Sequence, residues 1–294
     1  MTPTLKAHIS LFVAQVIYAL NYSIAKDVMP LHVKPLGLVF LRILGACILF
    51  WVASLFINKE VVEKADLKKI LFIALFGVVI NQAFFIYGLS ITKPINSAII
   101  MISNPIAVMI FTLIILREKI TSFKIIGLML GIGGALTLLL FRGSFAFGSE
   151  TAAGDLMTLV NSMSWAIFVV MAKPYMQKYQ TITVMKWCFL AGLIYFFPIG
   201  IKDALSIDWI AMPNRIVMAI LFIVIATTFF AYLLNMYALK ALSSSVVSMY
   251  IYFQPFLATL FAVWLGKDEI TPIKLLSAVF IITGVYLVSK KSKV

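Results

Sequence analysis

The chain has 294 residues, of which 63% are hydrophobic and only 12% are charged, and its formal net charge is +13. Soluble globular proteins average about 25% charged residues, so this composition excludes an ordinary soluble domain and favours a protein embedded in a lipid bilayer. Nucleic acid is not expected as a partner, because the basic residues are scattered singly through short segments instead of gathering in one patch.

Ten apolar stretches follow one another along the chain, each of about 20 residues and long enough to cross a hydrocarbon core of ~30 Å. The first has no small-residue cleavage site after its apolar run, so it is interpreted as a retained helix instead of a signal peptide. Together the stretches predict an all-α integral membrane protein with ten transmembrane helices. The predicted spans cover residues 9–29, 35–57, 69–90, 95–116, 122–141, 154–176, 182–201, 215–236, 243–265 and 272–289.

The distribution of Lys and Arg predicts how these spans are oriented. With the N-terminus inside, the segments on the cytoplasmic side hold about twice as many basic residues as the outer segments. The positive-inside rule therefore predicts that both termini are cytoplasmic.

The second half of the chain repeats the first. Residues 71–141 align with residues 221–291 at a constant offset of 150 without a gap, and the preceding part aligns at an offset of 147. We therefore expect two five-helix repeats, at residues 1–143 and 149–294. Because five is odd, the second repeat enters the membrane from the opposite side, which predicts an inverted repeat of the kind found in secondary transporters. Matching pairs include Lys26 and Lys173, Tyr87 and Tyr237, and Gly134 and Gly284.

Two prolines lie near the centres of equivalent spans. Pro105 in the fourth span follows Asn104, and Pro255 in the ninth span follows Gln254. Proline removes a backbone donor and cannot accommodate the carbonyl four residues earlier, and freed carbonyls are tolerated in a membrane where they line an enclosed or wet cavity. We predict that both prolines are helix-breaking hinges beside a substrate site. The alternative is that they are ordinary prolines of membrane helices.

Polar and aromatic side chains recur in the first, second, third, fourth, sixth, eighth and ninth spans. Each of these buried groups alone could simply hold helices together. As a set they favour the lining of a cavity that binds a small solute. The candidate substrate-binding residues are Tyr18, Asn21, Tyr22, Arg42, Asn81, Gln82, Asn104, Asn161, Trp165, Tyr232, Asn235, Tyr250 and Gln254.

Arg42 is the most costly of these residues, because it lies about seven residues into the second span, roughly 10 Å from its end at 1.5 Å per residue. A charge at this depth usually points inward and serves function, where it could attract a carboxylate. The alternative is that its long side chain snorkels to the membrane surface.

Acidic and histidine side chains do not occur in the middle of any predicted span. This argues against a buried carboxylate relay for protons, and no metal site or cofactor is expected. A membrane-embedded enzyme would need a nucleophile with its base, a metal cluster or paired acids, and a channel would need a continuous polar lining. Both remain alternatives to the favoured hypothesis, a carrier.

Gly127 and Gly131 form a small-xxx-small pair in the fifth span. Such a pair could form a homodimer face, but packing within the chain is the favoured interpretation.

In this order and spacing, the motifs resemble those of the drug/metabolite transporter superfamily, specifically its EamA-type ten-helix exporters. The resemblance covers the whole chain and implies a bacterial inner-membrane carrier that exports amino acids or related neutral, zwitterionic or aromatic metabolites. It also implies alternating access through a central cavity. The residues that carry it are an aromatic-Ala-x5-Ala-Lys pattern at Tyr18 to Lys26 and Trp165 to Lys173, Pro35 with Arg42, Asn104-Pro105, Gln254-Pro255, and the turns Glu118 to Thr121 and Asp268 to Thr271.

Overall fold

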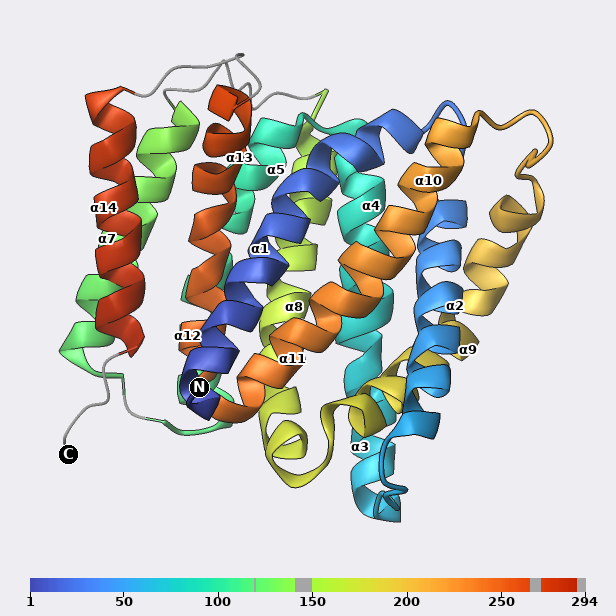
Figure 1. Cartoon of the computed structure of the whole chain (residues 1–294), viewed down its shortest axis with the longest axis horizontal. Coiled ribbons are helices and arrows are strands. Elements are labelled where there is room, and N and C mark those ends of the chain that lie inside the picture. The colour runs from blue at the N-terminus through green and yellow to red at the C-terminus, as the bar shows by residue number, and fades with distance from the viewer. Residues whose placement is uncertain (119, 141–149, 265–270, 290–294) are drawn as a thin grey trace.

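The computed structural model describes residues 1–118, 120–140, 150–264 and 271–289, and within these residues all regular structure is helical (Figure 1). Among the described residues, seven helices are long and apolar enough to cross a membrane, and two shorter apolar helices lie at Ser122–Thr137 and Leu275–Ser289. The chain is therefore a multi-pass membrane protein, as its composition predicts.

The helices follow one another with short turns between them. In the first half they are α1 (Pro3–Val28), α2 (Pro35–Ala53), the 3₁₀ turn η1 (Ser54–Phe56), α3 (Lys64–Ala74), the π-helical η2 (Leu75–Ile80), α4 (Asn81–Ile91), α5 (Pro94–Met101), α6 (Asn104–Ile115) and α7 (Ser122–Leu140). In the second half they are α8 (Ala152–Lys178), α9 (Thr181–Leu205), α10 (Asn214–Phe222), the π-helical η3 (Ile223–Phe230), α11 (Ala231–Ala241), α12 (Ser244–Met249), the 3₁₀ turn η4 (Tyr250–Tyr252), α13 (Phe253–Trp264) and α14 (Pro272–Ser289).

Local sequence explains several of the helix starts. Proline occupies the first turn of α1, α2, α5 and α6, where its missing N–H has no helical partner to lose. Thr2 and Ser243 cap α1 and α12 by accepting hydrogen bonds from the backbone N–H groups of Leu5 and Val246.

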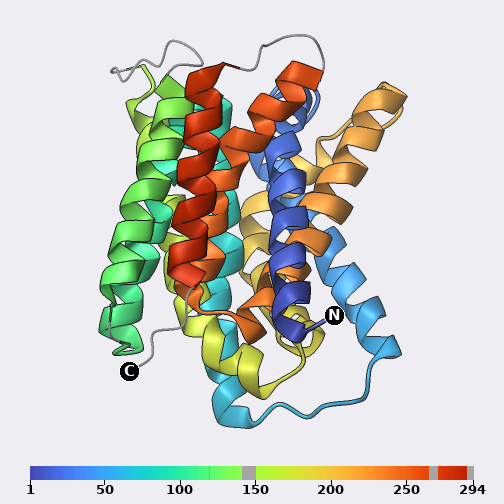
Figure 2. The same ribbon diagram turned by 60° about the vertical axis from the view of Figure 1, so that its left-hand side comes forward.

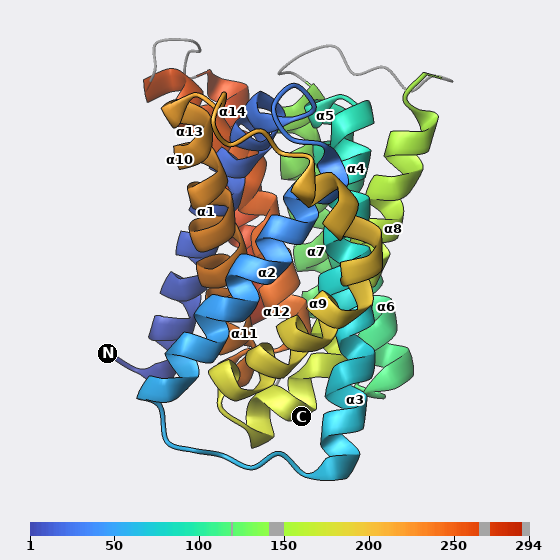
Figure 3. The same cartoon turned by 90° about the vertical axis from the view of Figure 1, so that its right-hand side faces the viewer.

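The start of α1 and the end of α14 lie at the same end of the bundle, which we call the terminal end (Figures 1 and 2). The segment 54–63 between α2 and α3 also lies there, whereas the turns at 29–34 and 206–213 lie at the opposite end, which we call the far end (Figures 1 and 3). Which end faces the cytoplasm stays a prediction from the charge distribution.

The last helices of the two halves, α7 and α14, pack against each other in antiparallel directions. A Cβ atom at Gly127 would lie 2.6 Å from the carbonyl oxygen of Gly284, and one at Gly134 would lie 2.7 Å from that of Ser277. At the offset of 150, Gly127 corresponds to Ser277 and Gly134 to Gly284. The two contacts are therefore the same contact seen twice, as an inverted repeat requires.

This packing also decides the role of the small-xxx-small pair. Gly127 faces Gly284, and a Cβ atom at Gly131 would lie 2.4 Å from the ring of Tyr252. Both glycines are thus used in packing within the chain, and a homodimer through this face stays a prediction.

Two equivalent lysines attach the first helix of each half to the end of the third membrane span of the same half, which is α4 in the first half and α11 in the second. The Lys26 ammonium donates to the carbonyls of Ser90 (3.4 Å) and Thr92 (3.0 Å) at the end of α4. The Lys173 ammonium donates to the carbonyls of Leu239 (3.3 Å) and Leu242 (2.5 Å) at the end of α11. A cation is favourable at a helix C-terminus because the last carbonyls are unpaired and carry partial negative charge.

Along the rest of their length, α1 and α8 pack across the repeat boundary. Helix α1 packs mainly on α11 and α13, and its counterpart α8 packs mainly on α4 and α6. The halves expected at residues 1–143 and 149–294 are consequently interlocked and do not form two separately packed bodies.

Candidate functional site

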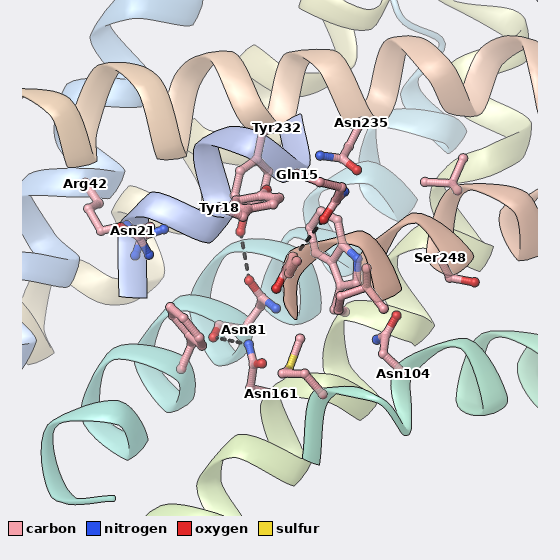
Figure 4. Close-up of a pocket in the computed structure, with 16 residues that line it drawn as sticks. Gln15, Tyr18, Asn21, Arg42, Asn81, Asn104, Asn161, Tyr232, Asn235 and Ser248 are labelled. Atoms are coloured by element: carbon pink, nitrogen blue, oxygen red, sulfur yellow. Dashed lines mark hydrogen bonds between the residues drawn. The ribbon is translucent and has the colours of Figure 1, made fainter. Parts of the chain in front are cut away.

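A cavity lies in the middle of the bundle, between both halves (Figure 4). The empty space between its walls, including the part that is open to the surroundings, is about 680 Å³. Its walls are Gln15, Tyr18, Asn21, Arg42, Asn81, Phe85, Met101, Asn104, Asn161, Trp165, Tyr232, Asn235, Val247, Ser248, Ile251 and Gln254.

Two broken helices border the cavity. Helix α5 ends at Met101 and α6 begins at Asn104, so Pro105 lies in the first turn of a new helix. In the other half, the 3₁₀ turn Tyr250–Tyr252 separates α12 from α13, which places Pro255 near the start of α13. The predicted breaks are present, but each lies just before its proline instead of at it. A role for these breaks as moving hinges stays a prediction.

Arg42 points inward. It is only 3% exposed, its Nε donates to the Thr228 hydroxyl at 3.0 Å, and its Nη1 has no hydrogen-bond partner in the described part of the chain. None of the ion pairs among the described residues involves Arg42. The snorkelling alternative is therefore wrong, and a buried guanidinium without a counter-charge is costly unless a ligand supplies one.

Two asparagines have amide groups whose orientation is set by their neighbours. Asn104 donates its Nδ2 to the carbonyl of Ser162 at 2.7 Å, and Asn161 donates its Nδ2 to the carbonyl of Asn81 at 2.8 Å. A carbonyl can only accept, so the Oδ1 atoms of Asn104 and Asn161 are the remaining acceptors. Both Oδ1 atoms are buried without a partner among the described residues, as is that of Asn21. Unpaired buried acceptors around a cavity are explained when a ligand or ordered water satisfies them.

The cavity wall also includes two aromatic rings that contact each other, those of Trp165 and Tyr232. The rings of Trp165 and Tyr232 meet edge to face with centroids 5.3 Å apart. The Tyr232 hydroxyl lies 2.8 Å from both Asn81 Oδ1 and the carbonyl oxygen of Gly77, and its single hydrogen can be donated to either. Gly77 belongs to the π-helical η2, where the regular i to i+4 ladder is interrupted. Tyr232 is thus held in place by hydrogen bonding, whereas the ring of Trp165 makes only packing contacts with the residues that the structure describes.

Ten of the thirteen candidate residues line the cavity, and two candidates whose side chains are described, Gln82 and Tyr250, do not. Gln82 is buried on α4 beside Asn81 but is not in the cavity wall. Tyr250 turns away, with its hydroxyl 2.7 Å from Nδ1 of His8. Tyr22 lies in α1, but its side chain is outside the described part of the structure.

Six wall residues were not predicted from the sequence: Gln15, Phe85, Met101, Val247, Ser248 and Ile251. A signal existed for Gln15, which lies three residues before Tyr18 on the same helix face. Its Oε1 accepts a hydrogen bond from Nε2 of Gln254 at 2.8 Å. The apolar wall residues carry no comparable signal, because membrane helices are apolar on every face.

The chain is similar to known proteins in its sequence and in its fold. A model of the EamA-like transporter family matches residues 5–140 and again residues 152–290. A protein of Archaeoglobus fulgidus named "Uncharacterized transporter" is 27% identical over 274 residues, which is 93% of either chain. A WAT1-related protein of Arabidopsis thaliana is 25% identical over 92% of this chain and 75% of its own. A solved crystal structure that is 18% identical superposes over 97% of this chain and 95% of that one with a TM-score of 0.76, which shows the shared fold.

Proposed function

Because the chain belongs to the EamA-like transporter family of the drug/metabolite transporter superfamily, and is therefore a membrane transporter and not an enzyme, we propose that it is a secondary carrier for a small metabolite. The proposed solute is an amino acid or a related neutral, zwitterionic or aromatic molecule that carries a carboxylate. The carrier acts as an exporter in the bacterial inner membrane and works by alternating access.

The guanidinium of Arg42, which has no counter-charge among the described residues, carries this proposal. A carboxylate is the group that satisfies a buried guanidinium best, because it accepts two parallel hydrogen bonds. No Asp or Glu belongs to the described cavity wall, so the counter-charge has to arrive with the solute. The site therefore favours an anionic or zwitterionic solute over a cationic one.

The amide oxygens supply the complementary half of the site. Asn104 and Asn161 present acceptors whose orientation cannot be exchanged without breaking a hydrogen bond to a backbone carbonyl. An ammonium group has three donors and no acceptor, and it matches such oxygens. With a carboxylate at Arg42, an α-amino acid would satisfy both kinds of group, and the Trp165 ring would pack against its side chain.

Alternating access is supported by the internal duplication. Equivalent contacts occur twice in the chain, as between Gly127 and Gly284 and between Gly134 and Ser277. Inverted repeats give a carrier two equivalent ways to expose one site to either side of the membrane. A channel does not need to expose its site to one side at a time. Saturable exchange of unlabelled for labelled solute distinguishes a carrier from a channel.

The proposal is tested by counterflow in proteoliposomes loaded with a panel of unlabelled amino acids, with and without a pH gradient. Trans-stimulated uptake of labelled solute that is lost in Arg42→Gln supports a carboxylate carrier. Uptake that follows the pH gradient would reveal a proton path. Flux that does not saturate with solute concentration would support the channel alternative. If no amino acid of the panel is transported, amino acids are excluded as the solute.

A further inference from the structure

His8 and Asp155 occupy equivalent positions, because they are 147 residues apart in the aligned first helices of the two halves. Each connects its helix to the opposite half. Nδ1 of His8 on α1 lies 2.7 Å from the hydroxyl of Tyr250 in η4. The Asp155 carboxylate on α8 accepts from the Thr92 hydroxyl at 2.5 Å and from Nδ2 of Asn96 on α5 at 3.4 Å.

A second pair of equivalent contacts lies two helical turns deeper, about 10 Å along each helix at 1.5 Å per residue. Gln15 on α1 accepts from Gln254 on α13 at 2.8 Å, and the Ser162 carbonyl on α8 accepts from Asn104 on α6 at 2.7 Å. Gln15 corresponds to Ser162, and Gln254 corresponds to Asn104. We call the contacts of His8 and Gln15 the terminal latch, and those of Asp155 and Ser162 the far latch.

The two latches lead from opposite ends of the bundle to the same cavity. Helix α1 starts at the terminal end and α8 starts at the far end (Figures 1 and 3). The inner contact of each latch includes cavity-wall residues, namely Gln15 and Gln254 in one and Asn104 in the other (Figure 4). Both latches are closed in this structure.

The opposite end of each helix is tied to its own half. Lys26 holds α1 to the end of α4, and Lys173 holds α8 to the end of α11. Each of these helices is therefore held to its own half by a lysine near its C-terminal end. It is held to the other half by packing, by its latch and by further contacts, among them Arg215 with Asp27 for α1 and Asn161 with the Asn81 carbonyl for α8. Opening one latch would move the start of that helix while its lysine end stays in place.

We infer that α1 and α8 are the two gates of the carrier: the terminal latch closes the cavity toward the terminal end, and the far latch closes it toward the far end. This inference rests on the proposed alternating-access function. It assigns gating roles to His8, Tyr250, Asp155 and Thr92, none of which lines the cavity.

The latches differ in strength. In the far latch, the Asp155 carboxylate accepts from two donors of the other half, Thr92 and Asn96. The outer contact of the terminal latch is the pair His8 and Tyr250, supported by the rings of Phe12 and Phe253 with centroids 5.9 Å apart. Hydrogen bonds to a carboxylate are stronger than those between neutral groups. Without solute, the terminal latch is therefore expected to open more often than the far latch. The charge distribution predicts that the terminal end is cytoplasmic. A cavity that opens more often to the cytoplasm suits an exporter.

The inference is tested by labelling a single cysteine in the cavity wall from either side. Cys47→Ala and Cys188→Ala remove the native thiols, and Ser248→Cys places the reporter. The protein is reconstituted into proteoliposomes in one known orientation. The rate at which a membrane-impermeant maleimide labels the cysteine then measures access to the cavity from the terminal end and from the far end. Tyr250→Phe is expected to raise the labelling rate several-fold from the terminal end and to lower it from the far end. Asp155→Asn is expected to produce the reverse.

Controls separate gating from general loosening. Tyr237→Phe, a substitution at a partly exposed tyrosine of α11, is expected to leave both rates unchanged. His8→Leu removes the other partner of the His8–Tyr250 contact and must shift the labelling rates in the same direction as Tyr250→Phe. Thr92→Val must likewise shift them in the same direction as Asp155→Asn. With two variants for each latch, a single misfolded variant does not decide the outcome. Shifts of the same sign for both latches, or none, would overturn the inference. Labelling needs no solute, so the gating inference can be judged even if none of the tested amino acids is transported.

Discussion

Tyr252 donates a hydrogen bond from its hydroxyl to the backbone carbonyl of Ile102 at 3.1 Å, and these two residues are each other's counterparts at the offset of 150. Tyr252 ends the 3₁₀ turn before α13, and Ile102 lies in the interruption between α5 and α6. The two helix breaks therefore meet directly at the centre of the duplicated architecture. Tyr252 is fully buried there and fills the space left by Gly131.

Tyr252→Phe is expected to destabilise the protein, because the substitution keeps the ring but leaves the Ile102 carbonyl without this donor. Removing one partner of a buried hydrogen bond costs about 1–3 kcal/mol. Thermal unfolding in detergent would show a lower midpoint than the wild type. Tyr237→Phe, on a partly exposed tyrosine, is the matched control and should keep the wild-type midpoint. Equal midpoints for both variants would contradict a stabilising role for this bond.

Arg42→Gln is expected to weaken solute binding about 10- to 100-fold, since a hydrogen-bonded charge typically contributes about 1.5–3 kcal/mol. The half-saturation concentration in counterflow measures this effect. Arg215→Gln is the matched control, because Arg215 pairs with Asp27 on the exposed surface at 2.6 Å. Unchanged saturation in Arg42→Gln would mean that the guanidinium does not contact the solute.

Asn104→Ala and Gln254→Ala are expected to reduce transport more than they reduce the amount of protein in the membrane. Each removes one inner contact of a cavity wall, with Ser162 in the first case and with Gln15 in the second. Transport rates normalised to membrane content would measure the difference. Gln180→Ala is the control, because Gln180 donates to the Asn58 carbonyl on an exposed segment. A parallel loss of folded protein and transport would assign these amides a structural role.

Gly127→Ala is expected to lower the thermal stability, because its methyl group would lie 2.6 Å from the Gly284 carbonyl and force α7 and α14 apart. Overpacking of this kind typically costs about 1–3 kcal/mol. Gly133→Ala in the same helix is the control, since a Cβ atom there meets no atom within 4 Å. Alanine is the better helix former by about 1 kcal/mol, so this control should be neutral or stabilising. A Gly127→Ala variant as stable as Gly133→Ala would show that the helices separate freely.

Much of the site could be predicted from single residues and their spacing. An amide beside a mid-span proline indicated a break at a cavity, and Asn104 and Gln254 are both in its wall. Arg42 was predicted to point inward because lipid does not tolerate an exposed charge at that depth. The predicted positions of Tyr250 and Gln82 in the cavity wall do not match the structure. A shift of one residue along a helix rotates the side chain about the helix axis, which is enough to point it at a neighbouring helix instead of the cavity.

The composition and the two constant offsets by themselves determined that this chain is a duplicated, all-helical membrane protein, because burial in lipid and internal duplication are properties of the order of residues alone. Only the tertiary structure decided which helices meet. Nothing local marks α1 as a partner of α11 and α13, or Asn104 as a donor to Ser162. In an apolar chain every helix face is compatible with lipid, so partners are chosen by close packing and by a few buried hydrogen bonds between residues far apart in sequence.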